Sequence, residues 1–312
     1  MAAAEAPIKR RWTADDIGDL TGTTVVITGA NSGLGLTSAE ALAEHGATVI
    51  MAGRNPLKLS EAAASVGGPA TSTVRLDLAD LESVRRAADE IAEQADRIDV
   101  LMNNAGVMAP PLSRTKDGFE LQIGTNHLGH FALTGLLLPL LHHEAARVVN
   151  VSSTAHTMGA MDLDDLNYEQ RKYSAWSAYG QSKLANLLFT AELDRRAAAA
   201  GWDLLATAAH PGYAATNLQF SGPGYAQNPI GKGLSWLGNL VLAQSAEAGA
   251  WPQLYAAVAP VQGDDYIGPT GFRGMRGHPG QADRTGAARD EDTARQLWEL
   301  SEELTGVTYD WS

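Results

Sequence analysis

Short apolar runs recur along the chain, and stretches with helical spacing separate them. The first run, Val25–Ile27, is continuous and β-branched, as in a strand that is buried on both faces of a parallel sheet. It stops at a glycine-rich turn, and a helical pattern follows as far as Glu44. We expect further strands and helices in alternation, with strands at Thr48–Ala52, Thr73–Leu76, Val100–Met102, Arg147–Val151 and Leu204–Ala208, and helices at Leu81–Gln94, Gly118–Leu141 and Ala178–Ala199.

This alternation predicts an α/β fold, with a doubly wound parallel sheet of about seven strands, right-handed crossovers and helices on both faces. The pattern loosens near the C-terminus, where Tyr266-Ile267 is expected as a seventh, edge strand and Gly268–Gly286 as a loop. An amphipathic helix, Asp290–Leu304, closes the chain. Because no repeat or linker divides the sequence, we expect an N-terminal arm (1–20) and a single domain (21–312), whose substrate-binding region is roughly 213–290.

Composition and charge narrow the functional classes. The 312 residues include no cysteine, which excludes disulfides, thiolate metal sites and a cysteine nucleophile. The net charge of −13 argues against a nucleic-acid partner, which needs a basic face. The N-terminus lacks the apolar core of a signal peptide, so the expected location is the cytoplasm. Residues 121–143 carry no Asp, Glu, Lys or Arg, yet their polar residues and Pro139 favour a buried helix over a membrane span.

The turn Thr28–Gly35, TGANSGLG, has the composition of an anion site. Glycine permits close approach of the backbone, and the helix that follows directs free N–H groups at whatever lies there, most plausibly a pyrophosphate. A P-loop is excluded because no Lys-Ser/Thr pair follows the last glycine. A tight turn without a ligand is the structural alternative.

Polar residues follow several of the expected strands, at the edge of the sheet where ligands bind in open parallel folds. They are the Gly29 turn, Arg54, Asp77, Asn104, Ser152-Ser153 and Pro211-Gly212. Arg54 stands where an NAD site would place an acidic residue for the ribose 2′-hydroxyl, and its guanidinium suits a 2′-phosphate. NADP(H) is therefore the preferred cofactor, with NAD(H) as the alternative. Arg54 could instead be an ordinary solvent-exposed side chain without a ligand.

Tyr179 and Lys183 stand four residues apart in an expected helix and so share one face. At about 5 Å, a cation would stabilise a phenolate by roughly 3 kcal/mol, which would bring the pKa of Tyr179 toward neutrality for general acid/base work. Tyr168 and Lys172 have the same spacing, but their charged stretch shows no buried face in the sequence pattern. We therefore assign the chemistry to Tyr179.

Together these motifs resemble the short-chain dehydrogenase/reductase family from Thr24 to Thr216, and so imply its Rossmann-type fold. The resemblance implies a catalytic tetrad of Asn126, Ser153, Tyr179 and Lys183, with Ser152 rejected in favour of the second serine. Asn126 would hold a water that links Lys183 to solvent. The cofactor-binding residues implied are Gly29, Asn31, Ser32, Gly33, Leu34, Gly35, Arg54, Asp77, Leu78, Asn104, Ala105, Gly106, Tyr179, Lys183, Pro211, Gly212 and Thr216.

The insertion before Tyr179, the long tail and the stretches VNVSSTAH and YGQSKLANLLFTAEL look like the retinol dehydrogenase and protochlorophyllide reductase-like branch. That branch implies carbonyl and alcohol interconversion on bulky apolar compounds, and the apolar Asn217–Ala243 segment fits such a substrate. The family usually pairs subunits through its two long helices, so a homodimer or homotetramer is expected. The alternatives are a non-catalytic NADP(H) sensor of the same fold and a nucleotide-sugar epimerase. No metal is expected, because His127, His130 and His142-His143 lack a third ligand in register.

Overall fold

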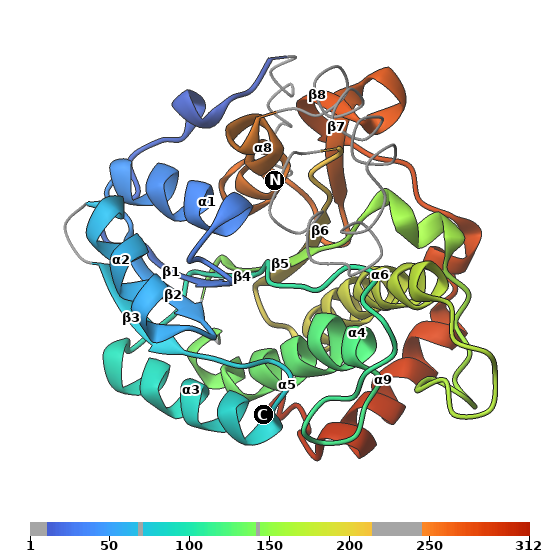
Figure 1. The fold of residues 1–312 in the computed structure, drawn as a ribbon. Helices are drawn as coiled ribbons and strands as arrows, with labels where there is room; N and C mark the ends of the chain where they lie inside the picture. The colour runs from blue at the N-terminus through green and yellow to red at the C-terminus, as the bar shows by residue number, and fades with distance from the viewer. Residues whose placement is uncertain (1–10, 68–70, 142–143, 214–244) are drawn as a thin grey trace, which may run out of the picture.

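The structure is a computed structural model that describes residues 11–67, 71–141, 144–213 and 245–312. Its sheet has eight strands in the order β3-β2-β1-β4-β5-β6-β7-β8, of which the neighbours from β3 to β7 run parallel (Figure 1). The predicted doubly wound α/β fold is thus confirmed. The strands are β1 (Thr24–Thr28), β2 (Thr48–Gly53), β3 (Thr71–Arg75), β4 (Val100–Asn103), β5 (Ala146–Val151), β6 (Leu204–Ala209), β7 (Tyr266–Gly271) and β8 (Arg276–Gln281).

Helices cover both faces of the sheet, which explains the continuous apolar run of β1 (Figure 1). Val26 joins one apolar core, whereas Val25 and Ile27 point to the other face and join a second. One face carries α1 (Gly33–Glu44), α2 (Pro56–Val66) and α8 (Ala246–Val258), and the other carries α3 (Leu81–Gln94), α4 (Leu121–Ile123), α5 (Gly129–Leu136), α6 (Ala175–Ala200) and α9 (Glu291–Thr305). The strand order reverses between β1 and β4, where open α/β sheets bind their ligands.

The predicted loop Gly268–Gly286 is wrong in part, because β7 and β8 pair there as an antiparallel hairpin. β7 consequently lies inside the sheet and β8 forms its edge. Strand β8 reads RGHPGQ and has no apolar alternation, so the sequence pattern did not reveal it. Its pairing rests on backbone hydrogen bonds to β7.

The long helix predicted over Gly118–Leu141 is broken into shorter segments. Between α4 and α5 lies a π-helical turn, Gly124–Leu128, and after α5 a 3₁₀ turn, Leu138–Leu141, begins just ahead of Pro139. These segments are almost wholly buried beneath the sheet, as the apolar composition predicted. Of the helices in the described ranges, none combines the length and apolar character that a bilayer span requires. His142 and His143 lie outside the described residues.

The C-terminal helix α9 and the tail behind it cover α5 and α6. Trp298 is buried, and Arg196 of α6 lies over its ring at 4.6 Å. The Tyr309 hydroxyl donates to the carbonyl of Phe131 at 2.7 Å. The tail also brings Trp311 to within 5.2 Å of Trp202, measured between ring centroids. Helix α9 and the tail therefore cover part of the two long helices through which a pairing of subunits was expected.

Part of the predicted N-terminal arm packs against the body of the domain. Trp12 and Ile17 are buried in the core that contains α1 and α8. Trp12 meets Tyr255 edge-on at 5.3 Å, and His278 Nδ1 donates to its carbonyl at 3.0 Å. Residues 11–20 thus join α8 to β8.

Candidate active site

The glycine turn after β1 brings the first turn of α1 directly against the strand. Gly29 and Gly33 have φ of 68° and 56°, which glycine adopts without strain. A Cβ at Gly35 would stand 2.5 Å from the Gly29 carbonyl oxygen, so only glycine fits there. The free N–H groups of Gly33–Gly35 consequently open at the end of the sheet, as an anion site requires. Asn31, Ser32 and Leu34 complete this turn.

Thr28 and His130 tie the glycine turn to the neighbouring loop. Thr28 Oγ1 accepts hydrogen bonds from the backbone N–H groups of Asn104 and Ala105, both at 3.0 Å. His130 Nδ1 donates to the carbonyl of Asn126 at 3.0 Å, so its Nε2 accepts from the Thr28 hydroxyl at 2.9 Å. Sequence reasoning missed both roles, because the two residues are 102 positions apart.

Asn104–Gly106 lie beside the turn, as predicted. The Asn104 amide donates to the Thr28 carbonyl at 2.7 Å and accepts from Gln253 of α8 at 3.2 Å. A Cβ at Gly106 would meet Asn126 Oδ1 at 3.1 Å and Lys183 Nζ at 3.6 Å. Gly106 therefore lies between two members of the predicted tetrad. Gln253 carried no motif and was missed.

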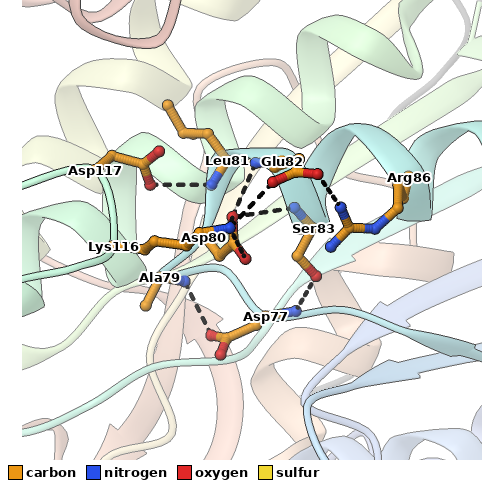
Figure 2. Close-up of polar contacts among 9 residues, drawn as sticks. All are labelled: Asp77, Ala79, Asp80, Leu81, Glu82, Ser83, Arg86, Lys116 and Asp117. Carbon is orange, nitrogen blue, oxygen red and sulfur yellow. Dashed lines mark hydrogen bonds and ion pairs between the residues drawn. The ribbon is translucent and has the colours of Figure 1, made fainter.

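Asp77 and Leu78 follow β3, where a polar network holds them at the start of α3 (Figure 2). Asp77 Oδ1 accepts from the N–H of Ala79 at 3.1 Å, and the Asp77 N–H donates to Ser83 Oγ at 3.0 Å. Asp80 caps α3, and its carboxylate pairs with Lys116 at 3.1 Å. Neither of the two Asp77 bonds uses its second carboxylate oxygen, Oδ2.

Arg54 follows β2 and is exposed at the same edge of the sheet. Asn31 lies beside it, because a Cβ at Gly53 would stand 3.2 Å from the Asn31 Oδ1 atom. Asn55 caps α2 by accepting from the N–H groups of Leu57 and Lys58. The chain after Arg54 is thus fixed, and its guanidinium is free to turn toward the glycine turn.

The Asn126 side chain binds protein atoms on both sides. Its Oδ1 accepts from the Val107 N–H at 2.8 Å, and its Nδ2 donates to the Val107 carbonyl at 3.0 Å and to Ser182 Oγ at 2.9 Å. Asn126 lies in the π-helical turn, where a carbonyl departs from the regular ladder. The Asn126 side chain thus holds the loop after β4 against α6.

The two serines after β5 are distinguished by their hydrogen bonds. Ser152 is buried, and its hydroxyl donates to the Lys183 carbonyl at 2.8 Å. Ser153 begins a 3₁₀ turn, Thr154–Met158, in which its Oγ accepts from the Ala155 N–H at 3.1 Å. The Ser153 side chain also lies close enough to the Tyr179 phenol to lower its pKa. The structure therefore brings the second serine, and not the first, to Tyr179.

Tyr179 and Lys183 lie in α6 on the face that packs against β5. Helix α6 begins at Ala175, three residues earlier than predicted. Lys183 Nζ is 5.8 Å from the centroid of the Tyr179 ring and donates to the Val151 carbonyl at 2.9 Å. Trp176, half-exposed, meets the Tyr179 ring edge-on at 6.1 Å. The expected pairing of phenol and ammonium on one helix face is present.

The expected effect on the phenol is reversed in the protein itself. Burial raises the pKa of Tyr179 to about 12, and the nearby Ser153 side chain opposes that rise. Burial also lowers the pKa of Lys183 to about 8. The sequence argument counted the attraction of the cation but not the cost of removing both groups from water. At neutral pH the phenol is protonated and the lysine is charged.

The rival pair Tyr168 and Lys172 differs from its sequence-based description. Tyr168 is buried, against expectation, and Arg171 lies over its ring at 3.8 Å. Its φ of 55° places it in a turn outside any helix, so the four-residue spacing does not create a shared face. The Asp165 carboxylate organises this turn by accepting from the N–H groups of Glu169 and Arg171.

Pro211 and Gly212 follow β6 beside the β7–β8 hairpin. Gly212 has φ of 66°, and the Tyr213 N–H donates to the Met275 carbonyl at 2.8 Å. Thr216 and the Asn217–Ala243 segment lie outside the described residues.

His127 and His130 are fully buried, and burial lowers the pKa of His127 to about 3 and of His130 to about 4. Among the described residues, no group of three side chains could hold a metal ion.

A family profile described as short chain dehydrogenase matches residues 23–222. Retinol dehydrogenase 13 of Homo sapiens is 42% identical over 295 residues, which cover 92% of this chain and 85% of the relative. Polyprenol dehydrogenase of Mus musculus is 38% identical over 295 residues, which cover 92% of this chain and 84% of the relative.

Two solved structures show the same fold. The crystal structure of an uncharacterized protein from Mycobacterium Paratuberculosis has a TM-score of 0.80 and 48% identity, and covers 96% of this chain and 99% of that one. The RhlG/NADP active-site complex of Pseudomonas aeruginosa has a TM-score of 0.63 and 23% identity, and covers 80% of this chain and 94% of that one. At that identity the second likeness concerns the fold alone.

Proposed function

The chain belongs to the short-chain dehydrogenase family, a family of NAD(P)-dependent oxidoreductases, and we propose that it reduces lipophilic aldehydes or ketones with NADPH, using Tyr179 as the general acid. The observation that carries this proposal is the convergence of Ser153, Tyr179 and Lys183 beside a glycine turn. The serine lies close enough to the phenol to lower its pKa, and the ammonium lies 5.8 Å from the phenol ring.

The glycine turn fits a dinucleotide. Its backbone N–H groups could contact a pyrophosphate directly. A Cβ at Gly35 would clash with the Gly29 carbonyl oxygen, so glycine is needed there for α1 to lie against β1. Asp77 and Leu78 would flank the adenine, and Arg54 would bind a 2′-phosphate through a charge-assisted bond. When bound there, NADPH supplies a hydride to the carbonyl carbon. The exposed guanidinium of Arg54 supports NADP(H) over NAD(H).

Tyr179 supplies the proton to the oxygen of the substrate. Because burial raises the pKa of Tyr179 to about 12, the phenol holds its proton at neutral pH and can give it to a more basic alkoxide. Ser153 donates a hydrogen bond to the same oxygen and stabilises the charge that develops there. The charged Lys183 stabilises the phenolate that the transfer leaves, and Asn126 fixes the loop that faces Lys183.

The substrate class is supported by apolar side chains around Tyr179. Trp176 is 50% exposed and meets the Tyr179 ring edge-on. Met158, 55% exposed, ends the 3₁₀ turn that Ser153 begins. Retinol and polyprenol, named in two relatives, are both apolar alcohols. We infer that an apolar body of the substrate lies against Trp176.

Turnover of a panel of aldehydes and ketones, followed at 340 nm with NADPH and with NADH, tests the proposal. We expect NADPH oxidation with long apolar aldehydes, a weaker rate with NADH, and loss of turnover in Tyr179→Phe. A thermal-shift titration separates binding from chemistry, because Tyr179→Phe should still be stabilised by NADPH. Stabilisation by NADPH without turnover of any carbonyl compound would instead identify a sensor.

A further inference from the structure

His156 is a buried imidazole attached to the proposed catalytic serine through the backbone. It is the third residue after Ser153 and is 2% exposed. Its Nδ1 lies 2.7 Å from the Ser153 carbonyl oxygen, and its backbone N–H donates to the same oxygen at 3.1 Å. The Ser153 carbonyl thus accepts two hydrogen bonds from His156, one from its backbone and one from its side chain.

The tautomer of His156 follows from this contact. A carbonyl oxygen only accepts hydrogen bonds, so Nδ1 must carry the proton and Nε2 the lone pair. Within the described part of the chain, Nε2 has no hydrogen-bond partner. Burial lowers the pKa of His156. The His156 side chain therefore forms its hydrogen bond through Nδ1 alone.

The Tyr266 ring packs against the imidazole, and His210 packs against Tyr266. Tyr266 of β7 meets the imidazole edge-on, with centroids 5.6 Å apart and planes at 85°. His210, at the end of β6, lies 5.1 Å from Tyr266. All three side chains are at most 3% exposed. The 3₁₀ turn is thereby anchored to β6 and β7 through His156.

We propose that His156 is a positioning residue for Ser153: its Nδ1–H holds the Ser153 carbonyl and thereby aims the serine hydroxyl at Tyr179. Fixing that carbonyl fixes ψ of Ser153, and the Ala155 N–H fixes Oγ from the other side at 3.1 Å. The hydroxyl proton remains available to donate, and the Tyr179 phenol lies close enough to Ser153 for the two side chains to interact. This role rests on the proposed function of Ser153 and Tyr179.

Asparagine and glutamine distinguish this role from packing. The Asn amide nitrogen stands where Nδ1 stands, whereas the Gln amide nitrogen stands where Nε2 stands. Glutamine is nearer to histidine in volume, so a packing role predicts that His156→Gln is the milder change. The positioning role predicts the reverse, with kcat in His156→Asn within about threefold of wild type and a loss of about tenfold in His156→Gln and His156→Ala.

The experiment measures kcat, KM for NADPH and the melting temperature of these three variants, and determines crystal structures of wild type and all three. His45→Asn is the matched control, because His45 Nδ1 also bonds a backbone carbonyl, that of Ala41 at 2.8 Å, far from the site. We expect KM for NADPH to remain unchanged and Ser153 Oγ to leave Tyr179 in the Gln and Ala variants only.

Two results would overturn the inference. The first is a Ser153 side chain in the same position in all four structures, and the second is a kcat of His156→Gln equal to or higher than that of His156→Asn. The crystal structures decide the matter even where wild type turns over no carbonyl compound, a result that would count against the proposed function instead. If His156→Ala does not fold, the comparison of Asn with Gln still decides.

Discussion

Gly159→Ala tests how closely the turn that bears Ser153 must approach the helix that bears Tyr179. Gly159 directly follows that 3₁₀ turn and lies against Gly180, the residue after Tyr179. A Cβ at Gly159 would stand 2.4 Å from the Gly180 carbonyl oxygen, and ordinary contact begins at 3.4 Å. The two elements must therefore separate by about 1 Å, the difference between these distances. Gly159 has φ of −78° and ψ of 140°, which alanine adopts freely, so the effect is purely one of contact.

A separation of about 1 Å would move the Ser153 hydroxyl away from the Tyr179 phenol, and such a displacement can cost about a hundredfold in rate. We expect kcat to fall by about that factor and overpacking to cost about 1–3 kcal/mol of stability. The measurement is kcat at 340 nm together with the melting temperature.

Gly180→Ala is a second, milder variant that tests the same close approach. Its Cβ would stand 2.8 Å from the Ala155 carbonyl oxygen, so the shift needed to reach 3.4 Å is about 0.6 Å. The better helix propensity of alanine offsets about 1 kcal/mol of the cost. The control is Gly286→Ala, where a Cβ meets nothing within 4 Å. A folded Gly159→Ala protein with kcat within twofold of wild type would refute this reasoning.

The remaining predictions concern charge, cofactor and assembly. Since the pKa of Lys183 is about 8, kcat/KM for NADPH in reduction should fall as pH rises through about 8, and a flat profile between pH 6 and 10 would contradict the assignment. Below that pH the folded chain must bury an ammonium group whose unfolded pKa is 10.5, at a cost of about 3 kcal/mol that fades as pH rises from about 8 to 10.5. Lys183→Met should accordingly melt higher than wild type at pH 7 while losing turnover, and a lower melting temperature would count against it. Arg54→Ala should raise KM for NADPH by about 10- to 100-fold and leave that for NADH unchanged, since a charge-assisted bond contributes about 1.5–3 kcal/mol; equal effects on both cofactors would remove Arg54 from the 2′-phosphate site. Because α9 covers α5 and α6, light scattering should find a monomer of 32.9 kDa, whereas a dimer would require pairing through another surface.

Much of the fold could be predicted because its signals are local. The β-branched run Val25–Ile27, the glycine spacing after it and the four-residue spacing of Tyr179 and Lys183 each lie within one or two elements. Strand β8 escaped prediction, because a strand that pairs through its backbone at a sheet edge needs no apolar alternation. The break in the predicted long helix escaped as well, since a π-helical turn has no composition of its own.

The supporting residues of the site could not be read from sequence for a different reason. His130 acts through Thr28, and Gln253 through Asn104, across separations of 102 and 149 residues. Only the folded chain brings them together. The pKa of Tyr179 was predicted with the wrong sign because spacing gives the distance to a cation, whereas burial depends on every element packed around α6.

The tryptophans at the C-terminus provide an intrinsic spectroscopic probe of how the tail is docked. Trp202 and Trp311 stand 5.2 Å apart at 72°, and Trp298 lies 6.5 Å from Trp311, close enough for their electronic transitions to couple. Their near-ultraviolet circular dichroism will vanish when the tail lifts from the sheet's helical layer. If NADPH binds beside the glycine turn as proposed, its fluorescence would follow the other edge of the sheet, so one sample would report undocking of the tail and loss of coenzyme in separate channels.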